Sequence, residues 1–362
     1  MIQRFYLFLI VLSVNAVTVW ADDSIVSRKS IFVIPHASYQ QETNWAAGLV
    51  AACYFKSSDL SQISSISSSV TYTLNKQFIV NISPKIYTDN KKWLLSGNLN
   101  FQNYPDFFYG IGGNATNLKV GYVSRNFNLT LQPQFILNKR FHIGPLVAFK
   151  FTELSTDSSA IFLGQNIYSA FGNAGWSKYD QFTLGVVAAY DSRDNQYYPE
   201  RGVFLKTIAG LSPKWLGSSF QIADFQLDAR YFKSLRAGHV LAIQSLFVGT
   251  YGDSLVPFQL LPTIGGADVF RGFRRGMYRD NYLTSIQSEY RFAFYKRLKA
   301  VVFLSAGNVF DSHFKGNSDL KIAYGTGLRY RLNDARVHLR FDIAKNNYDP
   351  KWQFYITATE AF

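Results

Sequence analysis

Side chains that could carry nucleophilic or metal chemistry are few and widely separated in this 362-residue chain. Every serine lies outside a Gly-x-Ser-x-Gly turn, the arrangement that presents the nucleophile in α/β hydrolases. Cys53 is the single cysteine, so the chain forms no internal disulfide. The five histidines lack the clustering of metal ligands: His36, His142, His239, His313 and His338. We therefore predict no catalytic residue, no metal, no cofactor and no enzymatic activity.

Charged side chains offer a second kind of chemistry, the ion pair. Late in the chain, basic residues recur opposite the apolar face of alternating segments: Arg329, Arg331, Arg336 and Arg340. Asp224, Asp228 and Asp342 fall on the same face of their own segments. We expect these groups to form a solvated, ion-paired wall rather than a ligand site.

The elements that position these residues are β-strands, because polar and apolar residues alternate along most of the chain. In 336–345, Val337, Leu339, Phe341 and Ile343 share one face. Runs of about ten residues are long enough for a tilted strand to cross a bilayer. The chain is 48% hydrophobic and 17% aromatic, yet its mean hydropathy is −0.04. This combination predicts an all-β transmembrane antiparallel barrel, with apolar residues facing lipid and polar residues facing the lumen.

The alternation predicts sixteen strands, an even number that places both termini in the periplasm. The predicted strands are 31–41, 45–55, 63–75, 77–88, 91–104, 119–137, 140–154, 181–191, 202–213, 220–235, 239–251, 282–294, 298–310, 322–332, 336–346 and 353–362. We assign the short connections, including Asn75-Lys76 and Asp89-Asn90, to periplasmic turns, and the long ones (105–118, 155–180 and 252–281) to extracellular loops.

The two ends of the chain predict export and membrane insertion. Residues 1–21 have the pattern of a signal peptide, with Arg4 before an apolar run and Ala21 at the cleavage position. Residues 22–30 would then be a short periplasmic segment and 31–362 the barrel. We place Phe354, Ile356 and Phe362 on one face of the last strand, an aromatic ending typical of outer-membrane barrels, and expect Glu360 at the rim of that face.

The net charge of +13 does not indicate nucleic-acid binding, because the basic residues are spread along the chain without a dense run. On an exported barrel, this charge suits a cationic lumen and rim facing outer-membrane lipids and lipopolysaccharide.

Three motifs resemble the BamA/TamA superfamily of outer-membrane assembly and translocation proteins of Gram-negative bacteria. The first is Gly265-Gly266 with Arg271-Gly272-Phe273, similar to the sixth extracellular loop of that family. The second is a hairpin containing Asp191, Arg193, Asp194 and Gly202. The third runs from Gly325-Thr326-Gly327 to Asp342. Residues 103–112 are similar to a barrel-only branch of the family, the bacterial surface antigen type, which lacks POTRA domains.

The resemblance implies that the long loop folds into the lumen and that Arg271 contacts acidic residues of the wall. Glu289 is the implied first partner, and alternation also turns it inward. At the second acidic position this chain has Ser305, and we hypothesise that Asp342 substitutes for the missing carboxylate. The contact either braces the barrel or acts directly in the mechanism. Arg193 and Asp194 are interpreted as residues that fix their hairpin.

The function implied by the resemblance is insertion or translocation of proteins, or lipids, through a lateral seam between the first and last strands. Pro35 is compatible with an edge strand. Without POTRA domains, the substrates would be unfolded outer-membrane or secreted proteins received with the help of a separate periplasmic partner. The alternatives are a passive pore or structural barrel and, less favoured by the motifs, a barrel enzyme such as a lipase.

Overall fold

The computed structural model describes residues 29–362 apart from 56–63, 89–91, 115–118, 157–160, 163–164, 167–175, 254–255, 312, 314–318, 333–335 and 359. The predicted signal peptide and the predicted segment 22–30 therefore lie outside the described residues, except for the strand residues Lys29 and Ser30. Among the residues described, no helix combines the length and hydrophobicity needed to cross a bilayer.

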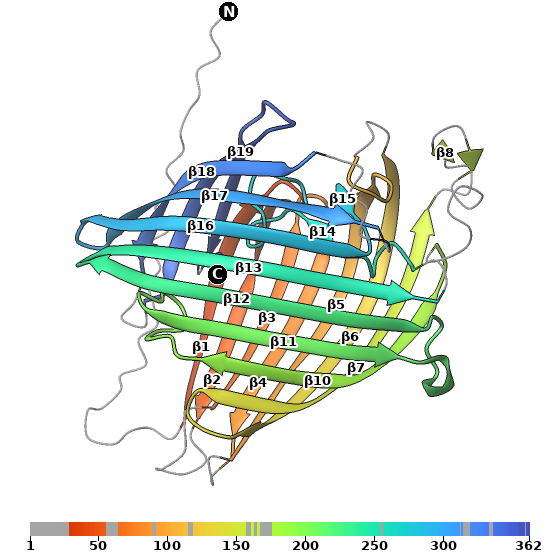
Figure 1. Ribbon diagram of the computed structural model, residues 1–362, viewed down its shortest axis with the longest axis horizontal. Helices are drawn as coiled ribbons and strands as arrows, with labels where there is room; N and C mark the ends of the chain where they lie inside the picture. The colour runs from red at the N-terminus through yellow and green to blue at the C-terminus, as the bar shows by residue number, and fades with distance from the viewer. Residues whose placement is uncertain are drawn as a thin grey trace, which may run out of the picture.

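Sixteen antiparallel strands form a closed barrel in which each strand pairs with the next along the wall (Figure 1). The prediction of sixteen strands is confirmed. The barrel strands are β1 (Lys29–Gln40), β2 (Asn44–Phe55), β3 (Ser64–Thr73), β4 (Phe78–Tyr87), β5 (Trp93–Phe108), β6 (Val120–Ile136), β7 (Phe141–Thr156), β10 (Tyr179–Asp191), β11 (Gly202–Ser212), β12 (Ile222–Arg236), β13 (His239–Gly252), β16 (Tyr282–Tyr295), β17 (Leu298–Phe310), β18 (Lys321–Arg331), β19 (His338–Asn346) and β20 (Gln353–Ala358).

Two short two-stranded sheets and one 3-10 helix lie in the described connections between barrel strands. β8 (Ile161–Phe162) pairs with β9 (Gln165–Asn166), and the 3-10 helix η1 (Lys214–Leu216) connects β11 to β12. β14 (Thr263–Ile264) pairs with β15 (Tyr278–Arg279) within the long connection from β13 to β16.

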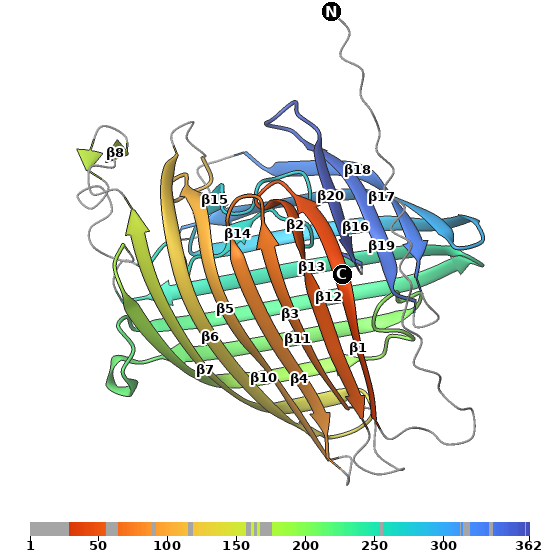
Figure 2. The same cartoon turned by 180° about the vertical axis from the view of Figure 1, so that it is seen from behind.

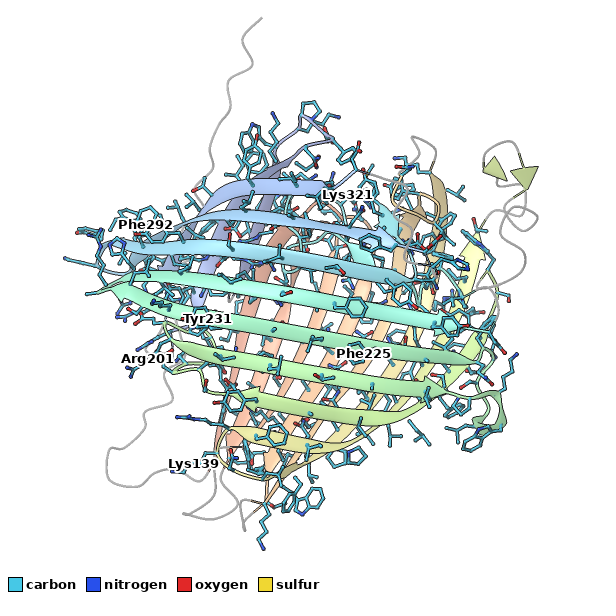
Figure 3. The ribbon with its side chains drawn as sticks, viewed as in Figure 1. Lys139, Arg201, Phe225, Tyr231, Phe292 and Lys321 are labelled. Atoms are coloured by element: carbon cyan, nitrogen blue, oxygen red, sulfur yellow. The ribbon has the colours of Figure 1, made fainter. Side chains whose placement is uncertain are left out.

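The two faces of the wall differ in polarity, as the alternation predicts. On β16, Leu283, Ser285, Gln287, Glu289 and Arg291 are buried. On the outer face, Ile286 is 53% exposed. Phe225 and Tyr231 likewise project outward from β12 (Figure 3). In a closed single-walled barrel the buried face is the interior, so polar and charged side chains line the lumen.

The structure corrects two predictions, the end of the last strand and the side on which one turn lies. The last strand ends at Ala358 rather than at residue 362. The turn at Asn75-Lys76 lies at the same end of the barrel as the turn 41–43 and the start of the long connection after β13, because consecutive hairpins point to opposite ends. It therefore belongs on the extracellular side, although it is short. The turn at Asp89-Asn90 lies outside the described residues.

The junction between β1 and β20, which we call the seam, closes the barrel with one pair of residues in register, Tyr39 and Ile356. Every other neighbouring pair of barrel strands is joined by six or more pairs; β19 and β20, for example, pair from Leu339–Ala358 to Ala344–Gln353. The two edge strands lie next to each other in Figure 2. Among the residues that the structure describes, most of the seam-facing edge of β1 therefore has no ladder partner.

Candidate functional site

The connection from β13 to β16 packs against the interior of the wall. Glycines allow its tight course: Gly265 has φ +111°, and a Cβ there would lie 2.5 Å from the carbonyl oxygen of Arg274. Phe270 and Phe273 are buried in a cluster with Leu283 of β16 and Val309 of β17. Burying these two rings removes a large apolar area from water, which holds the segment to the late strands.

Arg271 is fully buried between two carboxylates. Its guanidinium forms an ion pair with Glu289 of β16, and its Nη1 donates to Oδ2 of Asp342 on β19 at 2.8 Å. The ring of Phe303 lies 3.7 Å from the guanidinium carbon, within cation–π range. The hydrogen bond between Arg271 and Asp342, which is needed if Asp342 substitutes for the carboxylate missing at Ser305, is therefore present. Ser305 is also buried, and its Oγ makes no hydrogen bond within the described part of the chain.

The pair at Arg271 belongs to a larger buried ionic network. Arg329 bridges two carboxylates, with Nη1 2.5 Å from Asp342 Oδ1 and Nε 2.7 Å from Glu360 Oε2. Arg291 Nε lies 2.8 Å from Glu289 Oε2. Buried ions are costly unless each is paired and hydrogen-bonded, so these groups are mutually dependent.

Arg340 connects this network back to the loop. Its Nη2 lies 2.8 Å from Asp268 Oδ1 and donates to the carbonyl oxygen of Ala267 at 3.1 Å. Gly272 is held in the same way, because its N–H donates to the hydroxyl of Tyr355 at 2.9 Å and its carbonyl accepts from Asn346. The backbone of the loop is therefore fixed on both sides of Arg271.

Several sequence interpretations require correction here. The expected solvated wall is wrong for Arg329 and Arg340, which have no exposed surface. Asp228 pairs with Arg230, at 2.6 Å, rather than with the late arginines. Asp224 accepts a hydrogen bond from Thr250. Ion pairs across a barrel depend on which strands face each other, and this information is not local in the sequence.

The C-terminal residues also depart from the prediction. Phe354 is 54% exposed on the outer face, and Ile356 is partly exposed. Phe362, by contrast, is buried beside Phe232 of β12 and Ala242 of β13. Its carbonyl oxygen accepts a hydrogen bond from Arg291 Nη2 at 3.1 Å. Because the strand ends at Ala358, Glu360 and Phe362 turn inward instead of continuing the outer face and the rim.

Contacts from the loop to the early strands were not visible in the sequence. Arg274 Nη2 lies 2.8 Å from Asp106 Oδ1 on β5. The N–H of Arg275 donates to the carboxylate of Glu42 in the turn between β1 and β2. Burial raises the pKa of Glu42. These partners lie far away in sequence, and no motif marks Asp106 or Glu42.

The hairpin between β10 and β11 is fixed by its own polar residues. Asp191 accepts from the backbone N–H and the guanidinium of Arg193, the Nη2–Oδ2 distance being 2.8 Å. Asp194 Oδ1 accepts from the N–H groups of Glu200 and Arg201. At Gly202, with φ +112°, a Cβ would lie 2.4 Å from the carbonyl oxygen of Ser192. These contacts lie within the turn, and Asp194 Oδ2 also lies 3.1 Å from Arg336 Nη1 in the connection between β18 and β19.

The arrangement around Arg271 suits bracing better than covalent chemistry. Its described members are guanidinium and carboxylate groups that neutralise one another. Among the residues described, no group of three or more His, Cys, Asp or Glu side chains could hold a metal ion.

A closed antiparallel barrel with an apolar outer face and a polar interior defines an outer-membrane β-barrel protein. Residues 63–362 match the model of the Omp85 superfamily domain, so the chain belongs to the Omp85 superfamily and resides in the bacterial outer membrane. A comparison with curated protein sequences gives no match.

Several solved structures show a similar barrel fold. BamA from Haemophilus ducreyi lacking POTRA domains 1–3 is similar with a TM-score of 0.66 at 15% identity, covering 92% of this chain and 70% of that one. CdiB from Acinetobacter baumannii gives 0.57 at 15% identity, covering 92% and 59%. CdiB from Escherichia coli gives 0.60 at 11% identity, covering 90% and 62%. This chain thus spans about three fifths of the length of either CdiB chain.

Proposed function

We propose that the protein inserts or translocates proteins, or lipids, at the outer membrane by opening laterally at the seam. The observation that carries this proposal is the single register pair, Tyr39 with Ile356, that closes the barrel. Unpaired backbone groups are costly in a bilayer, so an edge closed by one pair has a strong tendency to acquire another strand.

The edge of β1 has the chemistry expected for strand addition. Main-chain hydrogen bonds supply affinity there and place little demand on the incoming sequence. Pro35 lies within β1 and cannot donate to a ladder, which limits permanent pairing. Ile31 and Val33 are each at least 60% exposed, so the strand offers an apolar surface to a client or to lipid. The proposed substrates are unfolded outer-membrane or secreted proteins, delivered by a separate periplasmic partner.

A disulfide across the register pair tests the proposal. The substitutions Tyr39→Cys and Ile356→Cys, made together in a Cys53→Ser background, would place two thiols within reach of each other. Paired antiparallel residues have Cα atoms about 4.5–5.5 Å apart, a separation that a disulfide accepts. The matched control joins Tyr39→Cys to Trp45→Cys, its register partner on β2, and leaves the seam free.

Assembly of outer-membrane proteins and export of secreted proteins would be followed in cells before and after reduction. We expect the seam disulfide to abolish an activity that reduction restores, and the control disulfide to leave it unchanged. Cells with a locked seam that are indistinguishable from wild type would refute lateral opening.

A passive pore is the second candidate, because cavities remain inside the early half of the barrel. One of about 490 Å³ is lined by Asn100, Asn126 and Lys150 among others. Steady conductance of the purified protein in planar bilayers, unaffected by the seam disulfide, would favour a pore over lateral opening.

A further inference from the structure

A second cavity, of about 570 Å³, lies inside the barrel at the periplasmic end of strands β4 to β11. Five basic side chains line it: Lys85, Lys139, His142, Arg193 and Lys206. Lys139 lies in the turn between β6 and β7, and Figure 3 places it toward the same end of the barrel as Arg201 of the hairpin between β10 and β11. We call this the basic cavity. It lies apart from the ionic network around Arg271.

The charges of the basic cavity are only partly balanced by its wall, because Asp228 of β12 lies opposite Lys206 in register but is paired with Arg230. Asp191 is the one carboxylate among the lining residues, and it is engaged by Arg193 through two side-chain hydrogen bonds of 2.9 and 2.8 Å. In the described structure, no carboxylate lies within ion-pair distance of Lys85, Lys139 or Lys206. Lys85 Nζ instead lies 3.4 Å from the amide oxygen of Gln196. Ammonium groups sharing a partly enclosed space repel one another, and a bound anion would offset that repulsion.

We propose that the basic cavity binds a phosphate-bearing ligand. Ammonium groups are common phosphate ligands, because each provides several donors on a flexible stem. The amides of Gln132 and Gln134 on β6 add neutral donors, and Leu94 and Phe204 supply apolar surface beside them. A phosphate group of a lipid and a free phosphate share this chemistry. The closed ladder between each pair of strands from β4 to β11 leaves no edge there for an extended peptide.

Isothermal titration of the full-length protein in detergent micelles would measure the site with three probes: pyrophosphate, dihexanoyl phosphatidylglycerol and a glutamate hexapeptide. The test variant is Lys85→Gln with Lys206→Gln. The matched control is Lys233→Gln with Arg236→Gln, which removes the same charge from exposed residues at the periplasmic end of β12. Heat-modified migration in gels would show that each barrel is folded.

We expect saturable binding of pyrophosphate, of the phospholipid, or of both. The probe that binds identifies the source of the phosphate, and affinity should fall as salt rises, because the cavity is partly open to solvent. The test variant should bind at least about tenfold more weakly, whereas the control should bind like wild type. The proposal is overturned if neither phosphate probe binds, if only the glutamate peptide binds, or if test and control variants weaken binding equally. None of these outcomes depends on whether the seam opens.

Discussion

The interior of the barrel is built in two different ways. In the late half, from β16 to β20, buried arginines and carboxylates contact the loop and one another, as at Arg271, Glu289 and Asp342. In the early half, amides and hydroxyls form a ladder across neighbouring strands. Asn128 Nδ2 donates to Asn100 Oδ1 at 3.0 Å, and Asn100 Nδ2 donates to Asn81 Oδ1 at 2.8 Å.

The two linings have different consequences for shape. An amide is both donor and acceptor, so a ladder of amides satisfies itself along the wall and leaves the centre open. A guanidinium has only donors, so a buried one needs acceptors. In the late half these acceptors are mainly carboxylates on the loop and on several strands, which draws these parts of the molecule together. Accordingly, the loop is anchored in the late half by buried ion pairs, and early strands line most of the cavities of about 570 and 490 Å³.

The largest expected effect comes from removing the charge of Arg271, which joins the loop to the wall. Arg271→Met keeps most of the side-chain volume but leaves Glu289 and Asp342 with fewer cations. We expect the free energy of unfolding to fall by about 3 kcal/mol, the lower end for breaking a buried pair, because Arg291 and Arg329 remain. Urea unfolding in lipid vesicles, followed by tryptophan fluorescence, would measure it.

The matched control is Asn100→Ala in the amide ladder. Its expected cost is about 1 kcal/mol, since neighbouring amides and water can replace the lost bonds. Equal losses in the two variants would mean that the two linings do not differ energetically.

A glycine on β18 offers a sharper test of the ionic half. A Cβ at Gly327 would lie 1.9 Å from Asp342 Oδ1, 2.6 Å from the backbone carbonyl oxygen of Phe341 and 2.7 Å from Arg329 Nη1, so Gly327→Ala should displace the carboxylate and strain the pairing of β18 with β19. We expect a loss of about 1–3 kcal/mol by the same urea assay, as for overpacking of a core. Gly121→Ala on β6 is the control, because the nearest atom to its Cβ would be 3.9 Å away. A silent Gly327→Ala would show that Asp342 is not held tightly.

The smallest expected effect on stability concerns Asp194, in the hairpin turn between β10 and β11. Burial alone would raise the pKa of Asp194, but donors from Glu200, Arg201 and Arg336 lower it below its ordinary value. The ionised Asp194 therefore makes its full contribution to the free energy of unfolding above the ordinary pKa of an aspartate. That contribution is lost as pH falls through the lowered pKa of Asp194 in the folded protein. Asp194→Asn should slightly reduce the drop in melting temperature between pH 6 and pH 3. An unchanged drop would contradict this assignment.

Much of this architecture could be predicted from local pattern. Alternation revealed all sixteen strands and the inward side of Glu289, because side-chain direction in a strand has a period of two. Pairings across the lumen could not be predicted in this way. Asp106 with Arg274 and Glu360 with Arg329 depend on the curvature of the wall and on where the last strand ends. The inward turn of Phe362 follows from the end of β20 at Ala358, which no breaker residue marks.

The central claim is that the seam between β1 and β20 is weakly closed. Distances measured across the seam test this claim most directly. Spin labels at Gln41→Cys and Lys351→Cys, both in exposed turns, would straddle the seam in a Cys53→Ser barrel in lipid nanodiscs. Labels at Gln41→Cys and Lys76→Cys would span the intact ladder between β2 and β3. Electron–electron double resonance should give a broad or two-component distance distribution for the first pair and a single narrow one for the second. Two equally narrow distributions would contradict the account, because the barrel would then be as firmly closed at Tyr39 and Ile356 as elsewhere.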